Sequence, residues 1–222
     1  MFSPEIFRVW RLVFLLLLTA CGNSDPESSD QSIATFKVTF TATWDESTHP
    51  SDFPSNPHFS PLVGLTHTDK FFLWNDVEAV TDGFKEMAET GKTGPLVTEI
   101  ETAISSGNAY AYVLASGPIA QSPGSIEVTF TASRDFPLLS LTSMIAPSPD
   151  WFVGIRNISL YSEGKWSEEI TIDLYAYDAG TDSGESYTSQ DIPTIPRKSV
   201  SKIETSPFEN GEKLGTIQIS KL

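Results

Sequence analysis

Short runs of alternating apolar and polar residues constrain the fold of this chain more than any other feature. In residues 34–44, ATFKVTFTATW, every second side chain after the first is apolar: Phe36, Val38, Phe40, Ala42 and Trp44. The same period returns in residues 125–133 and 169–177, and weaker runs cover residues 109–115, 138–146, 151–160 and 215–222. A period of two is typical of a strand with one buried face. About seven such strands, separated by Gly, Pro and Ser, predict an antiparallel β-sandwich.

The periodicity changes to a helical one between the first strand and the later ones. One stretch places apolar residues three or four positions apart before a stop at Gly91: Val77, Val80, Phe84 and Met87. A second stretch does the same between Pro95 and Gly107, with Leu96, Ile100 and Ile104. We therefore expect a short helical insertion within the sandwich.

Residues 1–20 have the layout of a secretory signal. Arg8 and Arg11 precede an apolar run, residues 13–18, which is too short to span a bilayer. The run leads into Leu18-Thr19-Ala20-Cys21, which resembles the lipobox of bacterial lipoproteins, whose cysteine is lipidated and becomes the new N-terminus. Cys21 is the only cysteine, so it cannot close an internal disulfide. We expect a signal peptide over residues 1–20 and a lipid anchor on Cys21.

Residues 21–33 carry this cysteine and a small, polar, acidic segment, which predicts a flexible tether ahead of one domain over residues 34–222. The chain has 14 basic and 29 acidic residues; without residues 1–20, which hold two arginines and one glutamate, 12 and 28 remain, a formal charge of −16. This acidity argues against nucleic acid as a partner. It is compatible with an extracytoplasmic domain that meets divalent cations.

Three stretches resemble the spondin N-terminal domain, a module of animal matrix proteins and of some bacterial secreted proteins. They are FSPLVGLTHTDKFFLW at residues 59–74, IAPSPDWFVGI at residues 145–155, and LYAYDAGTDSG at residues 174–184 followed by IPTIP at residues 192–196. The resemblance extends over about residues 35–222. It implies a mainly β fold, an eight-stranded antiparallel β-sandwich akin to C2 domains. It also implies a calcium ion bound by loops, and adhesion or binding rather than catalysis.

Asp150 and Asp178 are the candidate calcium ligands, because they match the aspartate positions of that family. Calcium takes oxygen ligands from carboxylates, carbonyls and water, usually on irregular loops. If residues 151–161 and 168–177 form neighbouring antiparallel strands, the two aspartates meet at one end of the sandwich. Asp182 is a reserve candidate, which we expect instead to accept hydrogen bonds within a turn. The alternative is that the aspartates cap turns without any metal.

The family's third side-chain ligand is a glutamate on the strand before SPDW, where this sequence departs from the pattern. Ungapped counting back from Asp150 reaches Thr131, whereas the nearest glutamate, Glu127, lies four residues earlier. Thr131 offers a hydroxyl and a small gap restores Glu127, so both stay candidates. The family's cysteines are missing too, so its disulfide bridges cannot form here.

Other sites compete with the metal centre. Residues 180–184, GTDSG, are similar to the serine loop of chymotrypsin-like proteases, but Thr181 replaces the glycine that should precede the Asp-Ser pair. The histidines stand nine residues apart, which fits no zinc motif, although loops still allow them to converge: His49, His58 and His67. Glu168 and Glu169 are expected at a solvated strand edge rather than as a glycosidase pair. Four tryptophans are expected to pack the core: Trp44, Trp74, Trp151 and Trp166.

These features predict a lipid-anchored, non-catalytic adhesion or binding module in the bacterial cell envelope, with Ca²⁺ as cofactor. Gly22 stands where an aspartate retains lipoproteins at the inner membrane of enteric bacteria, which favours the outer membrane. The expected contacts are the membrane through the lipid anchor and an envelope or extracellular glycan or protein. The alternatives are a purely structural envelope lipoprotein without a ligand and, with the least support in the sequence, an envelope hydrolase.

Overall fold

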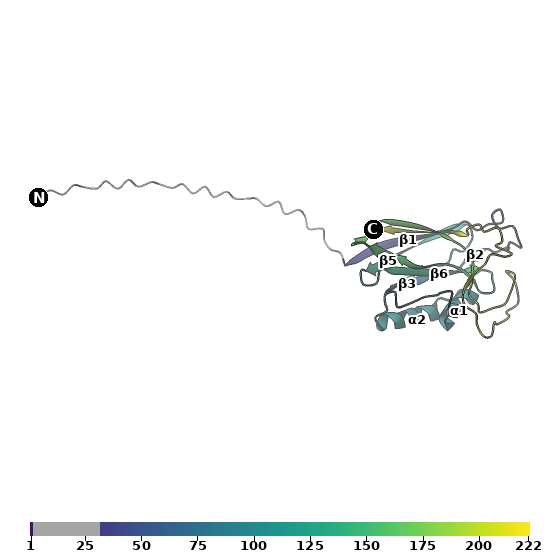
Figure 1. Ribbon diagram of the computed structural model, residues 1–222. Coiled ribbons are helices and arrows are strands. Elements are labelled where there is room, and N and C mark those ends of the chain that lie inside the picture. Colours follow the sequence, from purple (N-terminus) through teal and green to yellow (C-terminus); the bar gives the residue numbers. More distant parts are fainter. Residues whose placement is uncertain (2–31) are drawn as a thin grey trace. The chain divides into compact units, whose positions relative to one another are not determined.

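The computed structural model describes Met1 and residues 32–222 (Figure 1). Except for Met1, the signal peptide predicted over residues 1–20 lies outside these residues, as do Cys21 and most of the tether predicted over residues 21–33. Neither helix of residues 32–222 has the length and apolar character needed to cross a membrane.

The fold is mainly β, as predicted, with two helices inserted after the third strand. The strands of five or more residues are β1 (Ile33–Ala42), β3 (Val63–His67), β4 (Ala109–Leu114), β5 (Gly124–Ser133), β6 (Leu138–Ala146), β7 (Trp151–Ser159), β10 (Glu169–Leu174) and β13 (Gly215–Lys221). The two-residue strands are β2 (His58–Phe59), β8 (Tyr161–Ser162), β9 (Lys165–Trp166), β11 (Tyr177–Asp178) and β12 (Ser201–Lys202). The helices are α1 (Asp82–Thr90) and α2 (Gly94–Ser105). The longer strands thus number eight, the number that the family resemblance implies.

Two antiparallel sheets face each other. One has the strand order β10-β13-β1-β5, and the other has the order β12-β11-β7-β6-β3-β4 with β2 beside β6. A separate hairpin joins β8 and β9. The sandwich-like arrangement and the antiparallel pairing confirm the predicted fold class.

The alternation in β1 builds the core between the sheets. Four of its apolar side chains are at most 2% exposed: Phe36, Val38, Phe40 and Ala42. The threonines between them lie on the outer face, where Thr39 is the register partner of Glu127 on β5. Trp44, Trp74 and Trp151 are buried and Trp166 is partly buried against the core, which confirms the packing role expected of the tryptophans.

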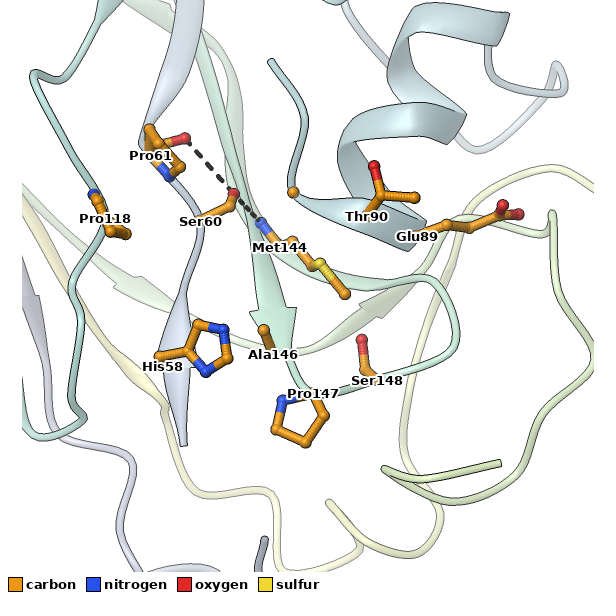
Figure 2. Close-up of a pocket in the computed structure, with 11 residues that line it drawn as sticks. His58, Ser60, Pro61, Glu89, Thr90, Pro118, Met144, Ala146, Pro147 and Ser148 are labelled. Atoms are coloured by element: carbon orange, nitrogen blue, oxygen red, sulfur yellow. Dashed lines mark hydrogen bonds between the residues drawn. The ribbon is translucent and has the colours of Figure 1, made fainter. Parts of the chain in front are cut away.

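The two helices cover the outer face of the second sheet (Figure 1). Thr81 caps α1, since its side chain accepts the Phe84 N–H, and the helix ends at Gly91 with a positive φ of 71°. Phe84 and Met87 are buried under the sheet as predicted, but Val77 is 82% exposed and precedes the helix. The C-terminal end of α1 lies beside β2 and the end of β6 (Figure 2).

One predicted strand is divided between the two sheets. Residues 169–174 pair with β13 in the first sheet, whereas Tyr177 and Asp178 pair with β7 in the second. The expectation that residues 168–177 form one strand beside residues 151–161 is therefore wrong. The chain crosses between the sheets at Tyr175 and Ala176, so Tyr177 is the one residue of the predicted strand that pairs with β7, and Asp178 pairs after it.

The two ends of the sandwich differ in what they carry. At one end, the ring of Tyr187 contacts Trp44, which follows β1, and Trp151, which begins β7, with centroids 5.6 and 5.3 Å away. At the other end, Ile33 begins β1 and the Leu222 N–H donates to the Thr35 carbonyl at 2.9 Å. The loops around Asp150 and Asp178 therefore lie at the end opposite to the start of β1 and the C-terminus.

Candidate metal centre

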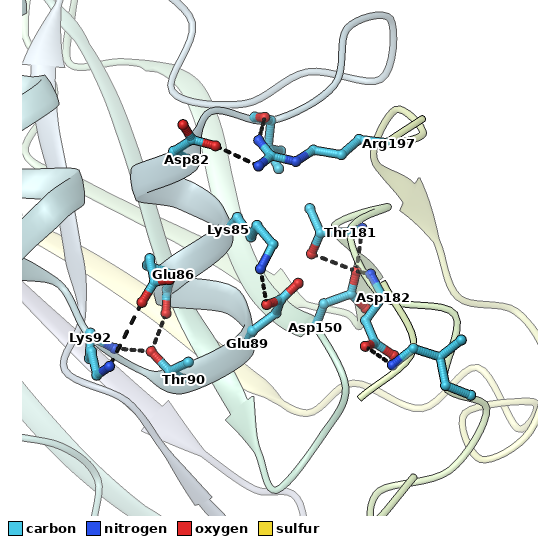
Figure 3. Close-up of polar contacts among 12 residues, drawn as sticks. Asp82, Lys85, Glu86, Glu89, Thr90, Lys92, Asp150, Thr181, Asp182 and Arg197 are labelled. Atoms are coloured by element: carbon cyan, nitrogen blue, oxygen red, sulfur yellow. Dashed lines mark hydrogen bonds and ion pairs between the residues drawn. The ribbon is translucent and has the colours of Figure 1, made fainter. Parts of the chain in front are cut away.

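Asp150 lies between β6 and β7 and is fully buried. Its Oδ2 accepts the backbone N–H groups of Thr181 at 2.7 Å and Asp182 at 3.0 Å, and the Thr181 hydroxyl at 3.2 Å (Figure 3). These bonds attach the loop after β11 to the start of β7. One aspartate thus holds together the two loops that the sequence singled out.

Asp178 lies beside Asp150 because β11 pairs with β7. Its register partner is Trp151, and the N–H of Ala179 donates to the Asp150 carbonyl at 3.3 Å. The Asp178 Oδ1 accepts the Gly180 N–H at 2.7 Å. The structure therefore brings the two predicted aspartates together at one end of the sandwich.

Burial raises the pKa of both carboxyl groups above the ordinary value. Burial, and then the nearby charge of Asp178, raise the pKa of Asp150 to about 6. Burial also raises the pKa of Asp178, while the charge of Lys198 opposes that shift. Ionised carboxylates in such surroundings are stabilised by a cation.

The residues present fit a calcium ion in part. The Asp150 Oδ1 is buried, and among residues 32–222 it has no hydrogen-bond partner. Open depressions of about 540 and 300 Å³ border Asp178, so this aspartate is reached from solvent, whereas Asp150 lines neither depression. However, residues 32–222 contain no cluster of three or more His, Cys, Asp or Glu placed to hold a metal. Calcium would thus be held by two carboxylates, with backbone carbonyls and water as its other ligands.

Two glycines allow the loops to approach this closely. Gly180 has a φ of 75°, and a Cβ there would stand 2.4 Å from the Lys198 carbonyl oxygen. At Gly184, a Cβ would stand 2.7 Å from the Cγ of Pro149 in the loop of residues 147–150. The absence of a side chain at these two glycines is therefore needed for contact between the loops.

Asp182 is a structural acceptor, the role favoured for it from the sequence. It is 4% exposed, its Oδ1 accepts the Gly184 N–H and its Oδ2 accepts the Ile192 N–H, both at 2.7 Å. These bonds close the loop of residues 182–192 upon itself. Both carboxylate oxygens of Asp182 are thus already in use.

The structure does not bring Glu127 to this pair. Glu127 lies on the outer face of the first sheet, where it accepts hydrogen bonds from Lys37 at 3.0 Å and Thr39 at 3.1 Å. In an alternating strand, a residue on the outer face cannot turn toward loops of the other sheet.

Thr131 is also placed away from the pair. Its carbonyl accepts the hydroxyl of Thr66 at 3.3 Å, and Thr66 is the register partner of Leu139, near the start of β6. Asp150 instead follows the end of β6. Both candidates for the third ligand are therefore placed elsewhere in the sandwich.

The competing sites have other roles in the structure. His67 pairs with the start of β6 and His58 with its end, so these histidines lie apart. The Ser183 hydroxyl contacts that of Thr194 at 2.7 Å, and the depression beside Ser183 has no histidine in its lining. Glu168 forms an ion pair with Lys221 at 2.8 Å. Each of these contacts is one that ordinary surface or core residues make in a folded domain.

Sequence reasoning missed Thr181 and Lys198. Thr181 gives Asp150 a backbone and a side-chain donor, but a backbone N–H carries no signal in the sequence. Lys198 comes to Asp178 because its own N–H donates to the Gly180 carbonyl at 2.9 Å. Only the folded path of residues 180–198 reveals that contact.

Comparison with known proteins shows the family of this fold. The family model Spondin_N matches residues 34–213. Human Spondin-2 is 32% identical over 212 residues, which is 92% of this chain and 64% of that protein. Mouse Spondin-1 is 31% identical over 200 residues, 85% of this chain and 25% of that protein. The chain thus spans less than two thirds of the length of these relatives, and it belongs to the spondin N-terminal domain family.

Proposed function

We propose that this chain is a non-catalytic, extracytoplasmic binding module whose Asp150–Asp178 end binds Ca²⁺. The observation that carries the proposal is the pairing of β11 with β7, which sets two buried or half-buried carboxylates side by side. The Asp150 Oδ1, which lacks a partner among the described residues, supports it. A divalent cation would supply the charge that both groups lack.

The bound ion would act on the loops and on the partner. By neutralising the two carboxylates, it would favour the ionised form of Asp150 and fix the contact between the loop of residues 147–150 and residues 178–184. Its remaining coordination positions would be open to an acidic or hydroxyl group of a glycan or protein ligand. The depressions beside Asp178 leave room for such a group.

The location follows from the N-terminal sequence. A signal over residues 1–20 and a lipidated Cys21 would place the module on a membrane of the bacterial envelope, with the outer membrane favoured by Gly22. Replacement of Cys21 by alanine is expected to move the protein from the membrane fraction to the soluble fraction and to abolish labelling with a radioactive fatty acid. Unchanged membrane partition would contradict the lipid anchor.

Calorimetric titration with calcium, combined with thermal melts, tests the metal. We expect saturable binding by the purified protein, with stabilisation of about 2.7 kcal/mol at a hundredfold excess over Kd. Asp150→Asn and Asp178→Asn should each abolish binding, whereas Asp135→Asn, at an exposed aspartate, should retain it. Failure of the unaltered protein to bind calcium would sink the proposal.

The absence of a third acidic ligand within residues 32–222 favours one other candidate, a sandwich that is structural and has no metal. In that case the two aspartates would serve only to attach the loops. The same titration decides between the two. A structural role predicts no heat of calcium binding in the unaltered protein, and a loss of stability in Asp150→Asn that does not depend on calcium.

A further inference from the structure

Lys198 lies at the entrance to the proposed calcium site. It lines, with Asp178, the depression of about 300 Å³, where it is the only base among the described residues of the lining. The other charged residues there are Asp182 and Glu185. The depression of about 540 Å³ has Asp178 and Glu185 in its described lining and no base. One ammonium group is thus the only positive charge where an ion from solvent would reach Asp178.

The backbone of Lys198 is fixed to the loop that carries Asp178. Its N–H donates to the Gly180 carbonyl at 2.9 Å, and its Cβ would lie 3.1 Å from a Cβ placed on Gly180. Three residues later, Ser201 on β12 is the register partner of Asp178. The backbone of Lys198 therefore stays near Asp178, whereas the side chain is exposed and its flexible stem lets the ammonium change direction.

The side chain of Lys198 has neither an ion pair nor a hydrogen bond in the part of the chain that the structure describes. Lys202, the next base along the chain, pairs with Glu204 at 3.8 Å. The charge of Lys198 acts on Asp178 instead. Burial raises the pKa of Asp178, whereas the Gly180 N–H and the charge of Lys198 lower it. The free ammonium therefore favours the ionised form of Asp178.

We propose that Lys198 is a built-in counter-ion of Asp178 that calcium must displace, so that this residue sets the calcium affinity. This inference rests on the proposed function. Without calcium, the ammonium supplies part of the positive charge that the two aspartates lack. With calcium, two cations compete for one carboxylate, and the repulsion between them opposes binding. A site weakened in this way suits surroundings rich in calcium, where extracellular modules have Kd values of about 10⁻⁴ to 10⁻³ M.

Calorimetric titration of full-length Lys198→Met with calcium tests the competition. Methionine keeps a long unbranched side chain but removes the charge, so we expect a Kd about fivefold lower than in the unaltered protein. Lys198→Arg, which keeps the charge, should leave the Kd within about twofold of the original value. The gain in Lys198→Met should also decrease as NaCl rises from about 0.01 M to about 1 M, because salt screens repulsion between exposed charges.

Lys202→Met is the matched control. Lys202 is also exposed, four residues along the same segment, but it lines neither depression at Asp178. Its replacement changes the net charge by the same amount and should change the Kd by less than about twofold. An equal gain in Lys198→Met and Lys202→Met would show a general effect of net charge and would overturn the inference.

A double-mutant cycle with Asp178→Asn tests the pairing without calcium. In the presence of a chelator at neutral pH, Lys198→Met should lower the melting temperature of the unaltered protein but not that of Asp178→Asn. Equal effects in the two backgrounds would contradict the inference. Calcium binding with the same Kd in the unaltered protein and Lys198→Met would refute the competition alone, whereas no binding by either would show that the proposed calcium site is wrong as well.

Discussion

Asp178 stands opposite Trp151 in the register of β11 and β7, and this single pairing puts its carboxylate next to that of Asp150. The two loops would otherwise have no reason to meet, since the strand that precedes Asp178 belongs mostly to the other sheet. The pairing therefore sets one buried and one half-buried carboxylate side by side, which is the arrangement on which the proposed calcium site rests.

The first consequence is a dependence of stability on pH in the absence of calcium. Burial and Asp178 raise the pKa of Asp150 from its ordinary 3.8 to about 6, so the folded state holds this proton more tightly than the unfolded state does. The contribution to stability is present below pH 3.8 and is lost as the pH rises through about 6. We expect a loss of about 3 kcal/mol across this window, measured by urea unfolding. Asp150→Asn should remove this component, and an unchanged pH profile in that variant would contradict it.

The buried histidines act in the opposite direction. Burial lowers the pKa of His49 and His67 below 6.5, so each stays neutral in the folded protein and gains a proton on unfolding. Their contribution is present above pH 6.5 and is lost as the pH falls below that value. In the Asp150→Asn variant, we expect unfolding free energy to decrease from about pH 7 to about pH 5. Stability that rises over this range would show that other groups dominate.

Gly180→Ala should destabilise the loop of residues 178–184 by more than the positive φ at this position alone explains. Alanine at a positive φ costs about 1 kcal/mol, and Gly164→Ala, in the turn between β8 and β9, measures that cost because nothing lies within 4 Å of its Cβ. At Gly180 the Cβ also meets the Lys198 carbonyl oxygen, so we expect a further loss of about 2 kcal/mol or more. Equal melting temperatures for the two variants would refute the role of this close contact.

Asp182→Ala should loosen the loop of residues 182–192. Removal of the carboxylate leaves the N–H groups of Gly184 and Ile192 without their acceptor, at a cost of about 2 kcal/mol. Hydrogen exchange at those two amides should become faster, and Asp182→Asn, which keeps one acceptor oxygen, should show a smaller change. If calcium affinity instead vanished in Asp182→Asn while exchange stayed slow, Asp182 would be a metal ligand.

The sequence was a good guide to β1 and a poor one to β10. The alternation through Phe36, Val38 and Phe40 identifies a strand with one buried face, because burial on one face is what produces that pattern. In residues 169–177 the alternation continues while the chain changes sheets. The period of the side chains does not indicate which strand is the pairing partner. Nothing in the sequence therefore indicates that the chain crosses to the other sheet before Tyr177.

The site shows the same division between local and long-range information. Asp150 and Asp178 were found because the motifs around them are local and are similar to those of a known family. Glu127 and Thr131 were chosen by counting along the chain, which does not say which face of β5 each side chain takes. Thr181 and Lys198 were missed because backbone hydrogen bonds bring them to the aspartates, and only the fold assigns the partners of those bonds.

Strand β1 runs from one end of the sandwich to the other. This strand runs from Ile33 to Ala42, about 30 Å at the usual rise of a strand, and ends near Trp44 on the side of the aspartate loops. Leu222 returns to Thr35 at the start of the same strand. A molecule fixed to a surface by either terminus would therefore hold the loops of Asp150 and Asp178 at the end away from that attachment.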